Sequence, residues 1–421
     1  MKRLIHSRTP AREALVLLNG DTPELFLLQD PSALPVGAVC LARVVDAKFA
    51  DINGVSAFFQ GGAAHYDASG RLKSDKLCEG DLFLVQVIRQ ATEDKEIKVT
   101  PKISLSSRYA VFCPTEEGVS VSRKIDDDDR ERLKGMFSDF NGGLMLRTAA
   151  AKVEEAVLKQ DVSDLKSLWQ DILSKALSGR TGVLYFPVPE TDRILEERIG
   201  EIDEVLTDDA QTAARLKKKY PFVRYEPKKD LWRSEGLDEA LEEALNEKVP
   251  LPSGGSLIVE ETAACVCFDV NSGGSSLRSA NKEAALEIPR QVLLKGLSGQ
   301  MIVDFAGKKD KKELSEYLPI LRNEKAGVSV WGITALGLVE MTRRGENKSL
   351  KESVGLEPTR TASKIVHKLW FGTVCGAVRV YAPTEVLSQV RRFSAALSER
   401  LGTKIAFETS LIVRTEGIKD E

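Results

Sequence analysis

Three polar residues, Asp269, Asn271 and Asp304, end or directly follow apolar stretches of the chain and could bind a cation. Two carboxylates that converge on one point repel each other unless a cation lies between them. Magnesium suits such a pair, because it prefers oxygen ligands and usually keeps several waters beside one or two carboxylates. A bound magnesium ion lowers the pKa of a water and offsets charge on a phosphodiester. The residue types therefore predict metal-assisted cleavage of a phosphodiester.

The segments around these residues predict a β-α-β unit. Apolar runs 256–270 and 300–305 flank a helical stretch, 279–297, in which Pro289 predicts a kink or an early end. Alternation of strands and helices predicts a mostly parallel sheet that is buried on both faces. A right-handed crossover makes the two strands parallel, so that both carboxylates emerge at one edge of the sheet. There Asn271 could orient a phosphate or a water. The alternative is that both aspartates only cap the loops that follow.

The upstream half predicts smaller β-rich units. Asn19-Gly20-Asp21 lies between two apolar runs, which predicts a hairpin. Residues 36–105 contain roughly five short strands separated by turns, which is typical of a small Greek-key barrel of the OB type. The acidic run 126–129 is interpreted as the start of a helix. Residues 152–178 carry apolar side chains at helical spacing and predict a long helix.

The composition indicates a folded protein of several domains. The chain has 421 residues, of which 42% are hydrophobic and 29% charged, with a net charge of -3. Binding to nucleic acid would therefore depend on local basic patches. The six cysteines form no CxxC pair and the three histidines are far apart, so we expect no structural zinc and no disulfide framework. No long apolar segment predicts a signal peptide or a membrane span, and we expect a cytoplasmic location.

Several motifs stand in order along the chain: KISLSSRYAVFCP, VSRKI, GGLMLRTA, LPSGGSLIVEETAACVCFDVNSG, NKEAALEIPRQ, GQMIVDF and GLVEMTRR. Together they resemble the motifs of the ribonuclease E/G family. The resemblance implies a multidomain α+β and α/β fold, with an S1-like OB domain inserted into an RNase-H-like subdomain. A 5′-sensor region and a DNase-I-like catalytic subdomain follow. The implied boundaries are 1–35 and 181–248 for the RNase-H-like subdomain, 36–110 for the OB domain, 111–180 for the 5′-sensor region, 249–345 for the catalytic subdomain and 346–421 for a small C-terminal domain.

The resemblance also assigns the candidate catalytic residues. It implies that Asp269 and Asp304 are magnesium ligands and that Asn271 acts beside them. It further implies that Arg147 and Thr148 hold the 5′-monophosphate of an RNA. A guanidinium fork and a hydroxyl suit a terminal phosphate, although Arg147 and Thr148 alone could be an ordinary strand pair.

Further residues are implied to bind RNA. Arg123 and Lys124 resemble a basic pair beside the 5′-phosphate pocket. Phe49 and Phe58 resemble exposed aromatic residues on which bases stack. Because Phe58 and Phe59 point to opposite sides of a strand, only one of them can face RNA. A phosphate contact is expected from a nearby lysine, either Lys98 or Lys102.

The chain departs from the family pattern at three places. Residues 345–358 lack the CPxC motif through which family members share zinc between subunits, so a zinc-linked tetramer is not expected and a homodimer through other surfaces stays open. Ala335 stands where the family tends to have arginine, and Arg343 or Arg344 could compensate. Asp304-Phe305 continues as Ala306-Gly307, without a second acid.

We therefore expect a magnesium-dependent endoribonuclease that cuts single-stranded RNA in RNA processing or decay, stimulated by a 5′-monophosphate. A relative that binds RNA without cleaving it is the main alternative, and a nuclease acting on DNA is a third.

Overall fold

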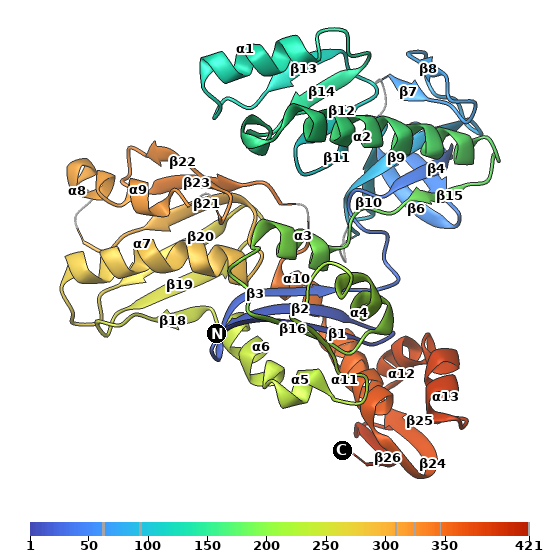
Figure 1. Cartoon of the computed structure of the whole chain (residues 1–421). Coiled ribbons are helices and arrows are strands. Elements are labelled where there is room, and N and C mark those ends of the chain that lie inside the picture. Colours follow the sequence, from blue (N-terminus) through green and yellow to red (C-terminus); the bar gives the residue numbers. More distant parts are fainter. Residues whose placement is uncertain (61–63, 92–94, 308–309, 324, 346, 420–421) are drawn as a thin grey trace. The chain divides into compact units, whose positions relative to one another are not determined.

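The computed structural model describes residues 1–60, 64–91, 95–307, 310–323, 325–345 and 347–419. The chain forms two compact units, each of which is described by itself (Figure 1). One unit is the continuous segment Leu34–Val188. The other combines Met1–Ala33 with Pro189–Glu421, so the first unit is an insertion into the second. The sequence prediction placed the corresponding boundaries after residues 35 and 180.

The inserted unit begins with a closed five-stranded barrel. The strands follow one another around the barrel in the order β4, β5, β6, β10 and β9, and pairing of β9 with β4 closes it. Small and branched apolar side chains fill its interior together with Phe59 and Phe83. The predicted OB-like barrel is therefore confirmed. The strands are β4 (Val39–Val44), β5 (Phe49–Ile52), β6 (Val55–Phe59), β9 (Leu82–Arg89) and β10 (Ile97–Thr100), with β15 (Gly182–Tyr185) paired to β4 and a small hairpin of β7 (His65–Tyr66) and β8 (Leu72–Lys73).

A four-stranded sheet makes up the rest of the inserted unit. Helix α2 (Glu155–Ala176) packs against it and contributes Trp169 and Ile172 to the core, as its helical spacing predicted. Helix α1 (Asp127–Met136) begins after Asp126, whose side chain accepts a hydrogen bond from the Asp129 N–H at 2.9 Å, so the acidic run does start a helix. The strands are β11 (Leu105–Ser106), β12 (Ala110–Cys113), β13 (Gly118–Val121) and β14 (Gly143–Leu146), and the 3-10 helix η1 (Thr148–Lys152) follows β14.

The second unit contains a five-stranded sheet in the order β17-β16-β1-β2-β3. The predicted hairpin is present, with Gly20 at a φ of 61° in the turn. The elements are β1 (Lys2–Arg8), β2 (Glu13–Asn19), β3 (Thr22–Gln29), α3 (Glu190–Glu197), β16 (Glu204–Thr207), α4 (Ala210–Leu216), β17 (Val223–Tyr225), α5 (Leu231–Ser234) and α6 (Leu237–Leu245).

A six-stranded sheet in the order β18-β19-β20-β21-β23-β22 follows in the same unit. Only its β20–β21 pair is parallel, so the prediction of a mostly parallel sheet is wrong. The reason is that the apolar run 256–270 folds as two strands, with a turn in which Thr262 and Cys265 hydrogen-bond to each other. The strands are β18 (Lys248–Pro250), β19 (Ser256–Glu261), β20 (Val266–Asn271), β21 (Gly299–Asp304), β22 (Val328–Ile333) and β23 (Val339–Arg343).

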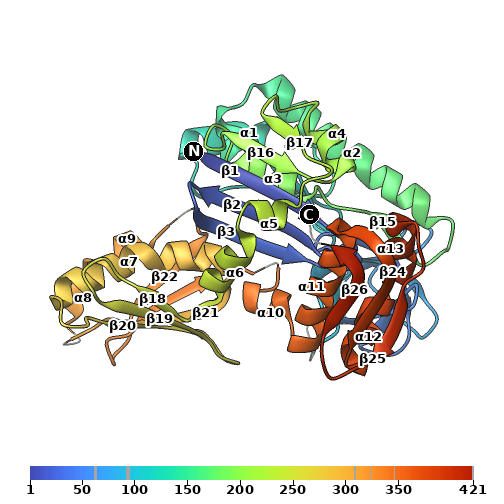
Figure 2. The ribbon, with the colours of Figure 1, turned by 90° about the horizontal axis from the view of Figure 1, so that it is seen from below.

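Helices cover one face of this sheet. Helix α7 (Leu277–Leu294) connects β20 to β21 and continues through the buried Pro289. Of the two predicted effects of this proline, a kink or an early end of the helix, the early end is therefore wrong. Helices α8 (Lys311–Ser315) and α9 (Leu318–Leu321) lie on the same side, as Figure 2 shows. Alternate strand residues such as Phe268 and Val303 are buried against these helices. Their neighbours on the opposite face are exposed or half-buried, which corrects the expectation that both faces are buried.

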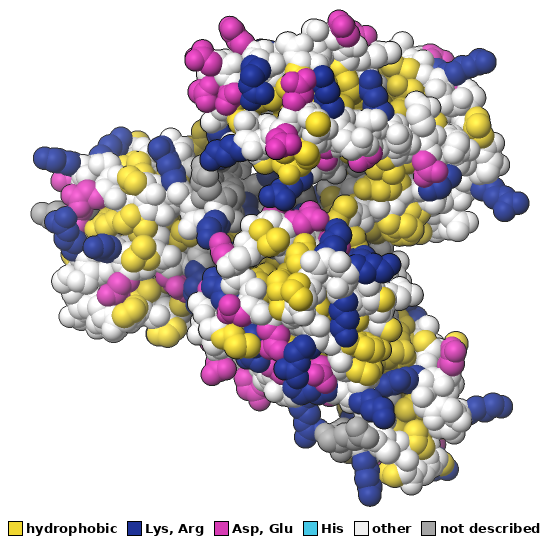
Figure 3. All heavy atoms as spheres, in the orientation of Figure 1, with side chains coloured by type: hydrophobic (Ala, Val, Ile, Leu, Met, Phe, Trp, Pro, Cys, Tyr) yellow, Lys and Arg dark blue, Asp and Glu magenta, His cyan; other side chains and the backbone are white. Residues whose placement is uncertain are grey.

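The chain ends in a small sheet in the order β25-β24-β26, packed against three helices. The elements are α10 (Leu350–Val354), α11 (Glu357–Phe371), β24 (Thr373–Ala382), α12 (Thr384–Arg391), α13 (Ser394–Leu401), β25 (Ala406–Thr409) and β26 (Arg414–Lys419). Within the described ranges, every helix is too short or too polar to cross a lipid bilayer. Basic and acidic side chains are interspersed on the visible face of each unit, in keeping with the small net charge (Figure 3).

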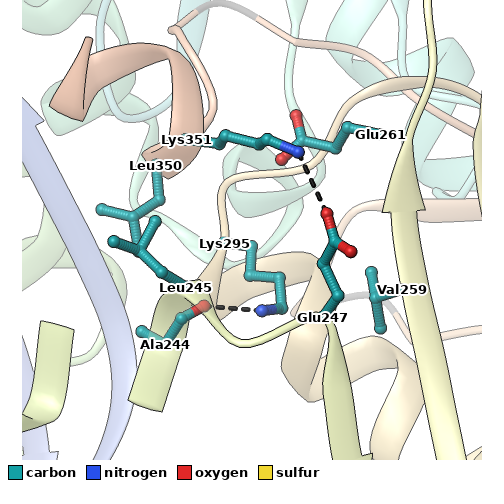
Figure 4. A pocket seen from close by; sticks show the side chains of 8 residues that line it. All are labelled: Ala244, Leu245, Glu247, Val259, Glu261, Lys295, Leu350 and Lys351. Atoms are coloured by element: carbon teal, nitrogen blue, oxygen red, sulfur yellow. Dashed lines mark hydrogen bonds and ion pairs between the residues drawn. The ribbon is translucent and has the colours of Figure 1, made fainter. Parts of the chain in front are cut away.

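A buried lysine fastens helix α10 to the neighbouring elements. Lys295 is 6% exposed, and its Nζ donates hydrogen bonds to the carbonyl oxygens of Ala244 at 2.6 Å and Asn246 at 2.7 Å. The Leu350 N–H donates to the Lys295 carbonyl oxygen at 2.8 Å. Figure 4 shows Lys295 in a small pocket beside Glu247 and Lys351, which form an ion pair at 3.1 Å. Helix α10 is thus held by contacts with residues earlier in the chain.

The burial of Lys295 predicts a pH-dependent stability. Burial lowers the pKa of its ammonium group to about 8, whereas the unfolded chain has about 10.4. Between these values the unfolded state binds more protons, so the contribution of Lys295 to folding grows as the pH rises. We expect the free energy of unfolding of the wild type, relative to that of Lys295→Met, to rise by about 2 kcal/mol from pH 7 to pH 9.5, as measured by urea unfolding. A constant difference would contradict the lowered pKa.

Candidate functional site

The structure brings the three predicted catalytic residues together on the six-stranded sheet. Asp269 on β20 and Asp304 on β21 are direct partners in the parallel register of these strands. Their side chains lie on the face opposite the helices, because the preceding residues Phe268 and Val303 are buried in the core. Asn271 lies on the same face, and its Nδ2 donates a hydrogen bond to Asp269 Oδ2 at 2.8 Å. Two carboxylates and an amide therefore share one edge of this pair of strands.

A buried asparagine fixes the chain directly after Asp304. Asn281 on α7 is only 2% exposed and makes two hydrogen bonds with the backbone of Ala306. Its Nδ2 donates to the Ala306 carbonyl oxygen at 3.0 Å, and its Oδ1 accepts from the Ala306 N–H at 2.9 Å. Asn281 was not predicted from the sequence. The available signal was a polar residue in the NKEAALEIPRQ motif at a helix position that faces the core.

Two glycines let the loop after Asn271 pack against the turn between β18 and β19. A Cβ added to Gly255 would lie 2.6 Å from the Asn271 carbonyl oxygen, and one added to Gly273 would lie 2.5 Å from the Gly254 carbonyl oxygen. Gly273 also has a φ of 56°, which favours glycine. Gly273 therefore meets the protein's own backbone. Gly274 has open space at its Cβ position.

The ligand set of the carboxylate pair suits magnesium better than zinc. Among the residues that the structure describes, no three histidine, cysteine or acidic side chains lie close enough to bind one metal ion. Structural zinc sites need about four such ligands, often sulfur or nitrogen. Magnesium accepts one or two carboxylates and completes its shell with water and phosphate oxygens. Asp269 and Asp304 supply hard oxygen ligands on an open face, so they fit the predicted ion.

The position that lacks the family arginine lies near the same edge of the sheet. Ala335 is exposed in the turn between β22 and β23. This turn lies beside Asp304, because Val339, the first residue of β23, pairs with Val303. Arg343 instead pairs with Gly299 at the other end of β21, and its Nη1 donates to the Leu297 carbonyl oxygen at 2.8 Å. The structure therefore does not bring Arg343 to the carboxylates, and the exposed Arg344 follows it at that distant end.

The predicted aromatic pair lies on the outside of the barrel. Phe49 and Phe58 are cross-strand partners, half-buried, with ring centroids 5.8 Å apart. Phe59 points inward and packs against Phe83, so Phe58 is the member of the Phe58–Phe59 pair that faces outward. Lys98 is in register with Phe58 on β10. Of the two candidate lysines, Lys98 is thus placed directly beside the rings, while Lys102 is exposed beyond the end of β10.

The predicted phosphate-binding residues meet at another edge of the inserted unit. Strands β13 and β14 are parallel, so Arg123 and Lys124 follow one strand where Arg147 and Thr148 follow the other. All four side chains are exposed. Ser122, which the sequence did not single out, joins the two loops through a 3.0 Å hydrogen bond between its Oγ and Thr148 Oγ1. Three cationic groups and two hydroxyls therefore gather at one edge.

Comparison with known proteins agrees with the motifs. The model of the Ribonuclease E/G family matches residues 104–346, which include the carboxylate pair and the basic edge but not the aromatic pair of the barrel. Ribonuclease G of Haemophilus influenzae is 30% identical over 359 residues, covering 78% of this chain and 73% of that protein. Ribonuclease G of Escherichia coli K12 is 30% identical over 342 residues, covering 73% and 69%.

A cyanobacterial relative extends the comparison. Ribonuclease E of Nostoc is 31% identical over 304 residues, which cover 65% of this chain and 44% of that longer protein. The family match covers more than half of the chain, and the relatives align over most of it. On these grounds the chain belongs to the ribonuclease E/G family.

Proposed function

We propose that the protein is a magnesium-dependent endoribonuclease that cleaves single-stranded RNA. The observation that carries this proposal is the placement of Asp269 and Asp304 as direct partners on adjacent parallel strands. Such a pair of carboxylates binds a cation in preference to standing alone. Membership of a family whose relatives are named Ribonuclease G and Ribonuclease E supports RNA as the substrate.

Each residue at the carboxylate edge has a distinct role in this proposal. Asp269 and Asp304 hold the magnesium ion, which when bound supplies a water of lowered pKa and offsets phosphate charge. Asn271 uses one N–H to fix the Asp269 carboxylate, which leaves its second N–H for a phosphate oxygen. Asn281 acts indirectly, because it holds the backbone that follows Asp304.

The inserted unit provides surfaces that suit a single RNA strand. The outward rings of Phe49 and Phe58 can stack on bases, and Lys98 beside them can contact a phosphate. Base stacking on aromatic side chains contributes roughly 1–3 kcal/mol per base and tolerates any sequence. Another edge of this unit carries cations and hydroxyls, which suit a 5′-monophosphate. Its residues are Ser122, Arg123, Lys124, Arg147 and Thr148. Stimulation of cleavage by the 5′-monophosphate is part of the proposal.

One observation favours a second candidate, an RNA-binding relative that does not cleave efficiently. Ala335 occupies the exposed turn beside Asp304, and a methyl group there offers no charge to a phosphate. The two candidates differ in one assay. A 5′-monophosphorylated, labelled single-stranded RNA is incubated with the protein in magnesium or in chelator, and both product and binding are measured. Retained binding with no product in magnesium would favour the second candidate.

Replacement of either carboxylate tests the first candidate. We expect Asp269→Asn and Asp304→Asn each to lower kcat/KM at least about 100-fold, because metal ions supply several kcal/mol of transition-state stabilisation. RNA binding to the inserted unit should persist, as measured by fluorescence anisotropy. Glu260→Gln is the matched control. Glu260 is exposed on β19 and pairs with Cys267, so it lies on the same face of the sheet as Asp269. The control should retain activity within about twofold. Full activity in either aspartate variant would contradict the proposed role.

Replacement of Arg147 tests recognition of the 5′ end. We expect Arg147→Gln to remove most of the preference for 5′-monophosphorylated over 5′-hydroxyl RNA, because a charge-assisted hydrogen bond to phosphate is worth about 1.5–3 kcal/mol, or roughly 10- to 100-fold. Cleavage of 5′-hydroxyl RNA should change little. Arg132→Gln is the control, because Arg132 is exposed in the same unit but is paired with Asp129 on α1. If Arg147→Gln kept the preference for 5′-monophosphorylated RNA, the 5′ end would have to bind at another surface.

A further inference from the structure

Trp331 is an exposed tryptophan whose ring is held in place. Its side chain on β22 is 72% exposed, whereas Trp169 and Trp232 are 4% and 2% exposed. The indole Nε1 donates a hydrogen bond to Thr342 Oγ1 on β23 at 2.8 Å. One end of the ring is therefore anchored while much of its surface meets solvent. A ring fixed in this way loses little conformational freedom when a ligand stacks on it.

Trp331 lies on the same open face of the sheet as the carboxylate pair. Thr342 points away from the helices, because its neighbour Met341 is buried against them. Thr342 pairs with Gln300, and Gln300, Ile302 and Asp304 alternate along that face of β21. With strands ~4.8 Å apart and a rise of ~3.4 Å per residue, the anchor of the indole is roughly 15 Å from Asp304. That distance corresponds to a few nucleotides of an extended single strand.

The surface between Trp331 and the carboxylates is suited to bases rather than to phosphates. Ile302 is half-buried there, and Glu340, its partner on β23, is exposed. A glutamate on this path repels a phosphate, while an aromatic ring accepts the face of any base without needing charge. The sheet face is continuous from the carboxylate pair to the indole, so a strand engaged at Asp304 can extend across it.

We propose that Trp331 stacks on a base of the RNA strand a few nucleotides from the scissile phosphate and so positions that strand at the carboxylate pair. This inference rests on the proposed function, because it takes single-stranded RNA as the ligand. Trp331 is a positioning residue in this scheme, since it contacts a base and not the reacting atoms. Thr342 has a secondary part, because its hydroxyl holds the ring.

The test uses the full-length Asp304→Asn protein and a short single-stranded RNA, so that binding is measured without cleavage. The tryptophan emission of this protein is compared with that of a second version that also carries Trp331→Phe. We expect RNA to quench, and to shield from acrylamide, a component of the emission that is absent in the Trp331→Phe version. RNA that binds without affecting this component would overturn the proposal.

Kinetics on the active protein provide the second measurement. We expect Trp331→Ala to raise KM roughly 5- to 100-fold with kcat within about threefold, and Trp331→Phe to retain most of the affinity. Leu286→Ala is the control, because Leu286 is 61% exposed on α7, on the helical side of the sheet. An unchanged KM in Trp331→Ala would overturn the proposal. So would a change of sedimentation mass in Trp331→Ala without a change in KM, because Trp331 would then bind a second copy of the chain.

The two proposals can fail separately. If Asp269→Asn still cleaved RNA while the Trp331 emission was quenched, the proposed role of the carboxylates would be contradicted and the stacking role of Trp331 would be supported. If both aspartate variants were inactive while the Trp331 emission was unaffected, only the stacking role would fall.

Discussion

The register between β20 and β21 is the constraint on which the proposed site depends. Asp269 and Asp304 are direct partners because these two strands are parallel and joined by α7. A shift of one residue in either strand would turn its carboxylate into the core, since side chains alternate between the two faces. Phe268 and Val303 oppose such a shift, because both are fully buried against the helices. The hydrophobic core therefore fixes the electrostatic arrangement on the open face.

The loops that follow the two carboxylates are fixed by contacts with other parts of the fold. Asn281 holds the backbone after Asp304 with a pair of hydrogen bonds, and the chain after Asn271 packs on Gly254 and Gly255. These contacts reduce the freedom of the two loops before any ligand binds, which lowers the entropy that binding must overcome. Farther along the chain, contacts with Glu247 and Lys295 hold α10 to the residues that follow α6 and α7.

The sequence allowed the carboxylate edge and the barrel to be predicted, because both depend on local patterns. Apolar runs that end in Asp269 and Asp304 gave the strands and their parallel crossover. The topology of the whole sheet was not predictable in the same way. The run 256–270 contains a tight turn from Thr262 to Cys265. Because the residues of this turn give no strong turn signal, the two antiparallel strands on either side of it were predicted as one strand. Ser122 and Asn281 were missed because their roles depend on partners distant in sequence, Thr148 and Ala306.

Whether Asp269 and Asp304 together hold one divalent cation can be measured by locating that cation in the protein without RNA. Ferrous iron can replace magnesium and, with ascorbate and peroxide, cuts the polypeptide next to its binding site. We predict cuts near residues 269–273 and 304–306, suppressed by excess magnesium and abolished in Asp304→Asn. Cuts at other segments, or an unchanged pattern in that variant, would show that these two carboxylates do not share a cation.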